Sequence, residues 1–260
     1  MSSILQDYRD AIKNSNIVVV ESGRKCKQVV RIIRAKCRKQ KFVGFDVEWV
    51  TEDGERKPIA LLQLSTGDGY CGLLRLCKMV SIPKCLSALL SDPDIIKLGV
   101  APFDDAEKML SDYNCKTKGT VDLRHLAALT GHNVSGLKGL SESILNVQME
   151  KSIEVRCSNW SADSLTDKQI DYAAADAILA VEIYKELFTD FARVYGEPIT
   201  CHQILMYRDI KFNQYETSCP SYCHQELLLL PVPYYMVNNV GCFLVAAQLE
   251  RPCCSGHQRA

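Results

Sequence analysis

The sequence predicts an α/β fold in which helices flank a mixed sheet of five or six strands. Between about Asn16 and Tyr195, short apolar runs alternate with amphipathic stretches, a pattern typical of α/β domains. Three apolar runs follow one another without a helical stretch between them, whereas the later runs alternate with helices. A sheet that combines both arrangements is expected to be mixed.

Each expected element has its own signal in the chain. Strands are expected at residues 17–20, 41–49, 58–65, 69–74, 94–100 and 120–123. Helices are expected at residues 23–41, 82–91, 105–113, 123–129, 136–145 and 164–188. Residues 66–69 (TGDG) predict a tight hairpin between two strands. Ser164 and Asp167 are spaced as a capping box, which predicts where the last helix begins.

The chain divides into a lead-in (residues 1–15), a main domain (residues 16–195) and a Cys-rich tail (residues 196–260). The tail has no helical or strand period, so it is expected to be poorly ordered. Its uncharged run at residues 227–249 contains prolines and asparagines, which argue against a membrane helix. A zinc site in the tail is an alternative, although the spacing fits no standard module. Its ligands would come from Cys219, Cys223, His224, Cys253, Cys254 and His257.

Charge and cysteine usage limit the partners and the compartment. The formal net charge is +0, so a polyanion could be attracted only by local patches. The chain has 13 cysteines, and those of the main domain show no zinc-type pairs. The polar start, MSSILQDYRD, lacks the apolar core of a signal peptide. We therefore expect free thiols and an intracellular protein that is nuclear, cytoplasmic or mitochondrion-associated rather than secreted.

Two carboxylates stand on one face of the predicted strand KFVGFDVEW. Alternation places Asp46 and Glu48 on the same side as Gly44, while Val43, Phe45 and Val47 take the other side in an apolar row. Two like charges this close are unfavourable unless a cation lies between them, and oxygen ligands suit Mg²⁺ or Mn²⁺. An edge strand with a solvated outer face is the alternative for an isolated Asp-x-Glu.

Two further regions offer acids to such a site. Tyr172 and Asp176 are four residues apart on the last predicted helix, so they share a face that is otherwise rich in alanine. A buried Asp on that face would need a partner. Asp104 and Asp105 lie where a strand gives way to a helix, a place where α/β proteins put site residues. Asp104 is also a candidate helix N-cap, and Asp105 could complement the helix dipole.

These motifs, taken in order, resemble those of a known family. DVE at 46–48, GV followed after four residues by Asp105, and YAAAD at 172–176 are similar to the three exonuclease motifs of the DEDDy family of 3'-5' exonucleases. That family has an RNase H-like fold. Longer blocks such as VGFDVEWV, PIALLQLS and LTDKQIDYAAADA also resemble the family, closest to the exonuclease 3'-5' domain-containing protein 2 group and next to the Werner helicase exonuclease domain.

The resemblance implies roles for individual residues. Asp46, Glu48, Asp105 and Asp176 become the metal ligands for two divalent cations, Mg²⁺ or Mn²⁺, and Tyr172 becomes the fifth catalytic residue. The implied activity is metal-dependent hydrolysis of phosphodiester bonds from the 3' end of DNA or RNA, which releases nucleoside 5'-monophosphates. A catalytically silent nucleic-acid-binding module of the same fold is the alternative, because fold alone does not fix function. A homodimer is a further expectation, in addition to binding of nucleic acid.

Contacts to the nucleic acid are expected from basic and polar side chains. Residues 24–41 contain nine Lys or Arg and no acid, so this helix would bind phosphates if its basic strip faced the cleft, with Val29, Ile32 and Ile33 turned inward. Solvation of that strip is the alternative. Further candidates for nucleic-acid binding are Lys138, Arg156 and Asn159, although Asn159 could form a turn and Lys138 could be an ordinary surface residue. His125 and His132 are expected to be structural, and Trp160 to be core.

Overall fold

Six strands form one mixed sheet in the computed structural model, which describes residues 5–149, 152–195 and 208–209. Their order is β2-β7-β6-β3-β8-β9. The bounds are β2 (Asn16–Val20), β3 (Phe42–Glu48), β6 (Leu61–Ser65), β7 (Tyr70–Arg75), β8 (Ile96–Gly99) and β9 (Thr120–Asp122). The central strands β3, β6 and β7 pair antiparallel, while β2–β7, β3–β8 and β8–β9 pair parallel. The expected mixed sheet of up to six strands is confirmed.

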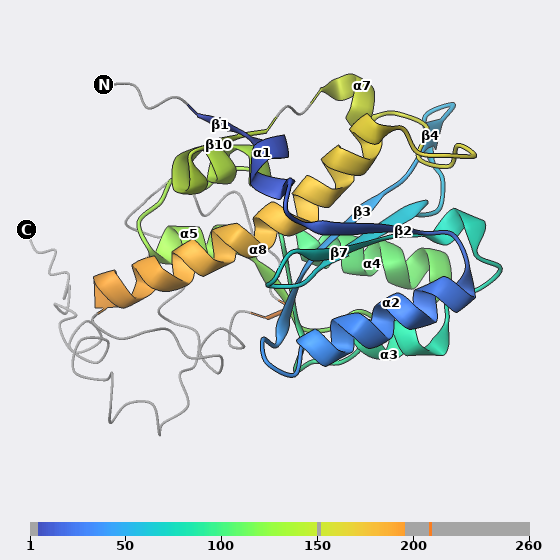
Figure 1. The fold of residues 1–260 in the computed structure, drawn as a ribbon, viewed down its shortest axis with the longest axis horizontal. Helices are drawn as coiled ribbons and strands as arrows, with labels where there is room; N and C mark the ends of the chain where they lie inside the picture. Colours follow the sequence, from blue (N-terminus) through green and yellow to red (C-terminus); the bar gives the residue numbers. More distant parts are fainter. Residues whose placement is uncertain (1–4, 150–151, 196–207, 210–260) are drawn as a thin grey trace, which may run out of the picture. The chain divides into compact units, whose positions relative to one another are not determined.

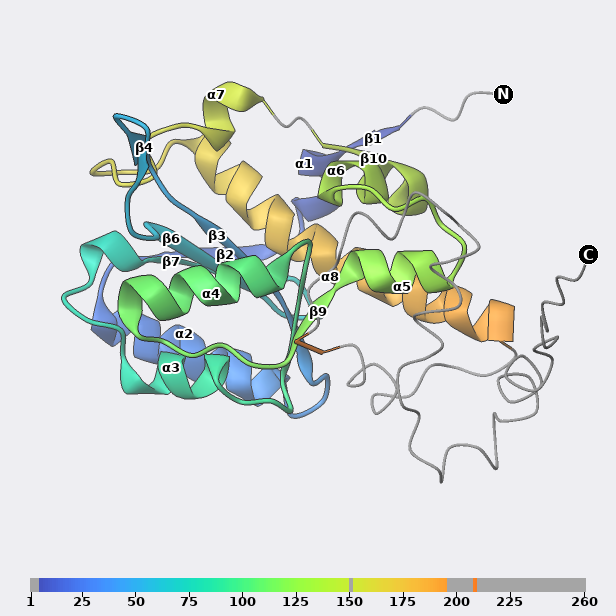
Figure 2. The ribbon, with the colours of Figure 1, turned by 180° about the vertical axis from the view of Figure 1, so that it is seen from behind.

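Helices cover both faces of this sheet (Figures 1 and 2). The larger ones are α2 (Gly23–Lys36), α3 (Lys84–Leu90), α4 (Pro102–Tyr113), α5 (Leu123–Leu129) and α8 (Asp167–Tyr195). The shorter ones are α1 (Tyr8–Ile12), α6 (Leu137–Leu140), η1 (Leu76–Lys78), η2 (Ser141–Leu145) and α7 (Ile153–Arg156). Helix α8 crosses one face of the sheet, and α2 and α3 lie on the other (Figure 1).

The alternation of β3 separates an apolar face from a polar one. Val43, Phe45 and Val47 are buried in the main core with residues of α2, α3 and α4. Gly44 faces α8, because a Cβ built there would meet the backbone of Ala177. The strand therefore contributes side chains to the hydrophobic core on one side and its two carboxylates to the α8 side.

The first large helix differs from its expected length and face. Helix α2 ends at Lys36, five residues before the expected end, and a turn leads into β3. Val29 and Ile33 are buried as expected, but Ile32 is 40% exposed. The buried stripe uses Cys26 and Val30 instead, which precede Ile33 by seven and three residues, both helical spacings.

The observed starts of α8 and α4 differ from the predicted ones, because several polar residues near each start could have capped the helix. Helix α8 is capped by Thr166 and Gln169: the Gln169 side chain accepts from Thr166 N at 2.9 Å, and Thr166 Oγ1 accepts from Gln169 N at 3.3 Å. The predicted pair Ser164 and Asp167 was therefore wrong by two residues. Helix α4 begins at Pro102 rather than residue 105, so Asp104 lies in its first turn and is not the N-cap.

The hairpin at residues 66–69 is confirmed, since Gly69 N donates to Thr66 O at 3.0 Å and Gly69 has φ 79°. A second hairpin, between β4 (Thr51–Glu52) and β5 (Glu55–Arg56), was not predicted. Its turn residues Asp53 and Gly54 both have positive φ, as two-residue hairpin turns require. The Asp-Gly pair was therefore a usable signal.

The segment expected to be a lead-in packs into the fold. Tyr8 and Ile12 of α1 are buried, and β1 (Gln6–Asp7) pairs in parallel with β10 (Val147–Gln148), so residues before Asn16 belong to the fold. Most of residues 196–260, including the candidate zinc ligands, lie outside the described residues. Asp209 is described: its backbone N donates to Thr120 O at 2.6 Å, and its carboxylate accepts from Thr120 N at 3.0 Å.

The described part of the chain gives the state of its cysteines and the hydropathy of its helices. All seven cysteines there are free thiols, as expected. None of the helices described there is at once long and apolar enough to cross a membrane.

A lysine is completely buried on β8. Lys97 has no exposed surface, and its ammonium donates to the carbonyl oxygens of Asp92 at 2.6 Å and Ile95 at 2.8 Å. Burial lowers the pKa of Lys97 to about 7, against the opposing effect of the Asp92 and Asp209 charges. An unfolded lysine keeps its proton to a pH of about 10.

This lysine is expected to make stability increase with pH. Between about pH 7 and pH 10 the unfolded chain binds one more proton at Lys97 than the folded chain, so the free energy of unfolding should rise with pH by up to about 1.4 kcal/mol per unit. Lys97→Met should remove this slope. Urea unfolding of both proteins at pH 7, 8 and 9 measures the difference, and parallel pH profiles would contradict the prediction.

Candidate functional site

A glycine lets helix α8 lie directly on strand β3. A Cβ at Gly44 would come within 1.9 Å of the Ala177 carbonyl oxygen, so only a hydrogen atom fits there. Ala173 and Ala177 on the facing side of α8 are fully buried. Because backbone meets backbone, a short Asp side chain on α8 can reach the carboxylates of the strand.

Three predicted acids meet at this contact. Ligand oxygens of Asp46, Glu48 and Asp176 all lie within 4.8 Å of one another. Asp176 is 3% exposed and Glu48 is 8% exposed, while Asp46 is half-buried. Three carboxylates this close repel one another strongly where water is largely excluded.

This donor set fits a hard divalent cation. Oxygen ligands on opposite sides of Mg²⁺ are about 4.2 Å apart, because each Mg–O distance is about 2.1 Å. Three carboxylate oxygens within 4.8 Å of one another can therefore converge on one ion with small side-chain movements. All three donors are oxygens, which favours Mg²⁺ or Mn²⁺ over softer metals.

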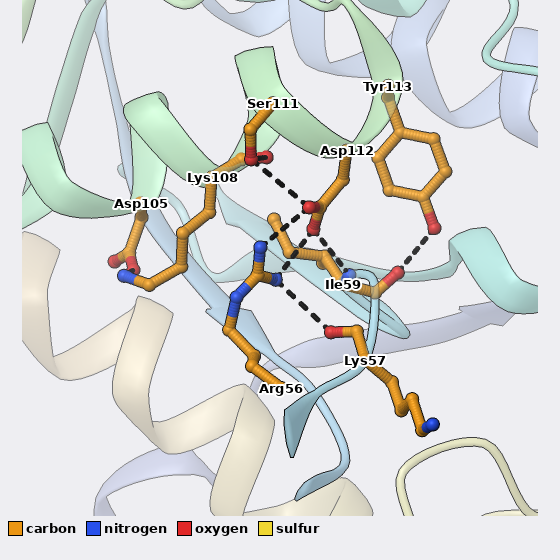
Figure 3. A network of polar contacts seen from close by, with 8 residues as sticks. All are labelled: Arg56, Lys57, Ile59, Asp105, Lys108, Ser111, Asp112 and Tyr113. Atoms are coloured by element: carbon orange, nitrogen blue, oxygen red, sulfur yellow. Dashed lines mark hydrogen bonds and ion pairs between the residues drawn. The ribbon is translucent and has the colours of Figure 1, made fainter.

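Asp105, the fourth predicted acid, lies outside this three-carboxylate cluster. It is 7% exposed, whereas Asp104 is half-exposed. Lys108, one turn later on α4, places its ammonium 3.0 Å from Asp105 Oδ1 (Figure 3). The same ammonium lies 4.8 Å from the centre of the Trp49 ring. Burial raises the pKa of Asp105 to about 6; Lys108 opposes this effect, and the charges on Asp104 and Asp176 add to it.

A polar network fixes the other end of α4 to the segment before β6 (Figure 3). Arg56 donates two hydrogen bonds to the Asp112 carboxylate, at 2.6 and 2.7 Å, and Asp112 also accepts from Ile59 N at 2.8 Å. Burial alone would raise the pKa of Asp112, but these hydrogen bonds outweigh it and lower the pKa. The Tyr113 hydroxyl donates to Ile59 O at 2.5 Å. The network holds the helix that carries Asp105.

Tyr172 lies one turn before Asp176 on α8 and is 4% exposed. Burial, followed by the charges on Asp176, Glu48 and Asp46, raises its pKa. Its hydroxyl therefore stays protonated at neutral pH and can act as a hydrogen-bond donor. The Trp160 ring packs 6.0 Å from the Tyr172 ring, and Trp160 Nε1 donates to Arg156 O at 3.1 Å. Trp160 is core, as predicted, and it also positions the tyrosine.

A cleft opens beside Tyr172. Its volume is about 360 Å³, and it is lined by Tyr172, by residues of α7 and by Arg9 and Lys168. The two basic side chains were not among the predicted site residues. Arg9 belongs to the segment expected to be a lead-in. Its position next to Tyr8 was the only feature of the sequence that could have indicated a binding role.

The predicted nucleic-acid-binding residues lie at different places. Arg156 is exposed at the end of α7, and its charge tends to lower the pKa of Tyr172, so it lies on the side of the site. Asn159 accepts from Ser161 N at 3.0 Å, which is the turn-forming alternative. Lys138 is exposed on α6, 3.9 Å from Glu142.

The basic strip of α2 does not face the carboxylates. Helix α2 lies on the opposite face of the sheet from α8 (Figure 1). Arg24, Lys27 and Arg31 of this helix line a groove of about 470 Å³. The expected role in binding substrate phosphates required the strip to face the cleft, and it does not. His132 pairs with Asp190 at 2.9 Å and His125 is buried, and neither belongs to the cluster, as expected.

Comparisons with known proteins give the family. A family model described as 3'-5' exonuclease matches residues 23–191. The exonuclease 3'-5' domain-containing protein 2 of Drosophila melanogaster is 47% identical over 162 residues, which cover 62% of this chain and 28% of that protein. The Homo sapiens protein of that name is 35% identical over 188 residues, 69% of this chain and 30% of that protein. The chain belongs to the 3'-5' exonuclease family.

Similarity extends to a further relative and to a solved structure. The Mus musculus bifunctional 3'-5' exonuclease/ATP-dependent helicase WRN is 32% identical over 201 residues, 75% of this chain and 14% of that protein. A crystal structure of the EXD2 exonuclease domain soaked in Mn is 33% identical, with a TM-score of 0.44, and covers 70% of this chain and 94% of that one. This chain spans less than a third of the length of these whole relatives.

Gly44→Ala should separate α8 from β3. The added methyl group would overlap the Ala177 carbonyl, so we expect a loss of about 3 kcal/mol in the free energy of unfolding and at least about tenfold weaker Mn²⁺ binding. Thermal unfolding and titration calorimetry measure these two effects. Gly23→Ala is the matched control, because its Cβ would have only an ordinary contact of 3.8 Å with Pro83. Unchanged Mn²⁺ binding in Gly44→Ala would contradict the prediction.

Proposed function

We propose that this chain is a metal-dependent 3'-5' exonuclease that hydrolyses phosphodiester bonds of DNA or RNA and releases nucleoside 5'-monophosphates. The observation that carries the proposal is the convergence of Asp46, Glu48 and Asp176 within 4.8 Å, beside a tyrosine that stays protonated. Membership of the 3'-5' exonuclease family supports the direction of cleavage. The catalytic domain is proposed to comprise residues 16–195 together with β1 and α1, which pack against them.

Four carboxylates would hold two divalent cations. Asp46, Glu48 and Asp176 would bind the first, and Asp46 with Asp105 would bind the second. When bound, such cations lower the pKa of a water molecule and neutralise charge on the phosphate oxygens. Lys108 lies 3.0 Å from Asp105 and favours the ionised form of its carboxyl group, and a bound metal ion would favour that form in the same way.

The remaining side chains would bind and orient the substrate. Tyr172 would donate a hydrogen bond to the attacking water and so fix its direction of approach, while Trp160 keeps the tyrosine ring in place. Arg9 and Lys168, at the cleft beside Tyr172, would attract the phosphates of the terminal nucleotides, with Arg156 at the same side. No part of this assignment requires the strip on α2.

A catalytically silent nucleic-acid-binding module is the second candidate. It is favoured by one observation: Asp105 is paired with Lys108 and lies outside the three-carboxylate cluster. A protein with only one complete cation site could still bind a strand without cleaving it. In either case an intracellular compartment, nuclear, cytoplasmic or mitochondrion-associated, is proposed because the seven described cysteines are free thiols.

Asp176→Asn should abolish cleavage and leave the fold intact. The wild type should shorten a 5'-labelled oligonucleotide stepwise from its 3' end in Mg²⁺ or Mn²⁺ but not in EDTA, and the variant should be slower by about 10³-fold. Glu186→Gln is the control, because this acid is exposed on the same helix. Running the assay with DNA and with RNA identifies the preferred sugar. Binding without shortening in every metal would favour the silent module instead.

Tyr172→Phe should reduce turnover without changing its pH dependence. Burial raises the pKa of Tyr172, so its hydroxyl does not ionise in the working range, and its removal costs only orientation, about 10–100-fold in rate. Tyr184→Phe, a buried tyrosine further along α8, is the control. Rate profiles between pH 6 and pH 9 should have the same shape in all three proteins. A lost alkaline limb in Tyr172→Phe would mean that the phenol titrates during catalysis.

A further inference from the structure

Gln63 faces the carboxylate site from the neighbouring strand. In the antiparallel pairing of β3 with β6, Gln63 stands directly opposite Asp46. Its neighbours Leu62 and Leu64 belong to the apolar core with α2 and α3, so the Gln63 side chain points to the other face, where α8 and the carboxylates lie. Directly opposed residues have Cβ atoms only about 5 Å apart.

The amide of Gln63 is buried without a hydrogen bond. The side chain is 0% exposed, and within the part of the chain that the structure describes neither its oxygen nor its nitrogen has a hydrogen-bond partner. Strand position 63 is surrounded by leucines at 61, 62 and 64, so an apolar side chain would suit the fold better. A buried amide without partners is destabilising, and such groups in native proteins are frequently tied to function.

We propose that Gln63 is a positioning residue for Asp46, and that its amide NH₂, which has no partner among the described residues, donates to the Asp46 carboxylate when a divalent cation binds there. A carboxylate accepts about four hydrogen bonds, so oxygen lone pairs of Asp46 not directed at a cation can accept from the amide. Such donors favour the ionised form of a ligand and fix its direction. The inference rests on the cation site of the proposed function, but it concerns metal affinity and does not require cleavage.

The two readings of Gln63 predict opposite effects of removing the amide. A positioning amide destabilises the metal-free protein and strengthens cation binding. If the amide only supports the fold, its loss would lower the stability of the metal-free protein and leave its affinity for the cation unchanged. Met has nearly the length of Gln but no amide, so Gln63→Met tests the group with little change in volume.

The experiment is calorimetric titration of the EDTA-treated full chain with Mn²⁺, combined with its thermal unfolding without metal. For Gln63→Met we expect about 10–100-fold weaker Mn²⁺ binding. We also expect a metal-free unfolding temperature about 2–6 °C higher than that of the wild type. Leu61→Met is the matched control: Leu61 is equally buried on the same strand, opposite Glu48, and should bind Mn²⁺ within about twofold of wild type.

Each outcome decides the proposal. Wild-type affinity in Gln63→Met overturns it, as does an equal loss of affinity in Leu61→Met or a lower metal-free unfolding temperature in Gln63→Met. Should that variant not fold, the Gln63 side-chain amide signals of the wild type are followed by NMR while Mg²⁺ is added. Their saturable shift supports the proposal, and their constancy overturns it. If the wild type binds Mn²⁺ but degrades no oligonucleotide, the exonuclease function fails while the role of Gln63 is still tested.

Discussion

The close approach of α8 to β3 is the constraint on which the site depends. At Gly44 the helix backbone at Ala177 occupies the space of a side chain, which brings Asp176 within reach of Asp46 and Glu48. Asp side chains are short, so a helix packed at the usual distance of about 10 Å from a sheet could not complete such a cluster. The small residues of this interface are therefore requirements of the chemistry as much as of packing.

The two faces of the sheet divide stability and chemistry between them. The face under α2, α3 and α4 is an apolar core that includes Val43, Phe45 and Val47. The α8 face carries buried polar groups on successive strands, among them Gln63 and Arg75. Each of these groups costs free energy when it is desolvated. The apolar face must therefore supply the stability that allows three carboxylates to stay close together without a cation.

The sequence predicts the pairing of site residues within one element better than the element ends, because such pairs depend only on periodicity. A period of two places Asp46 and Glu48 on one face, and a spacing of four places Tyr172 with Asp176. Helix starts depend on which of several polar residues folds back, so Ser164 was chosen where Thr166 caps the helix. The pairing of Asp105 with Lys108 was not predicted, because a spacing of three residues also fits an ordinary surface ion pair.

The position of α2 illustrates a limit of a different kind. The nine basic side chains of residues 24–41, six of them on α2, are visible in the sequence. The face of the sheet that a helix covers is decided instead by the path between the strands it joins. Strands β2 and β3 are separated by β7 and β6, and the connecting helix crosses beneath them on the side away from α8. Charge composition therefore predicts that a helix has a basic face that could bind a polyanion. The topology decides whether that face lies near the three-carboxylate cluster. The basic side chains that line the cleft beside Tyr172, Arg9 and Lys168, come instead from elements that carry no excess of basic charge.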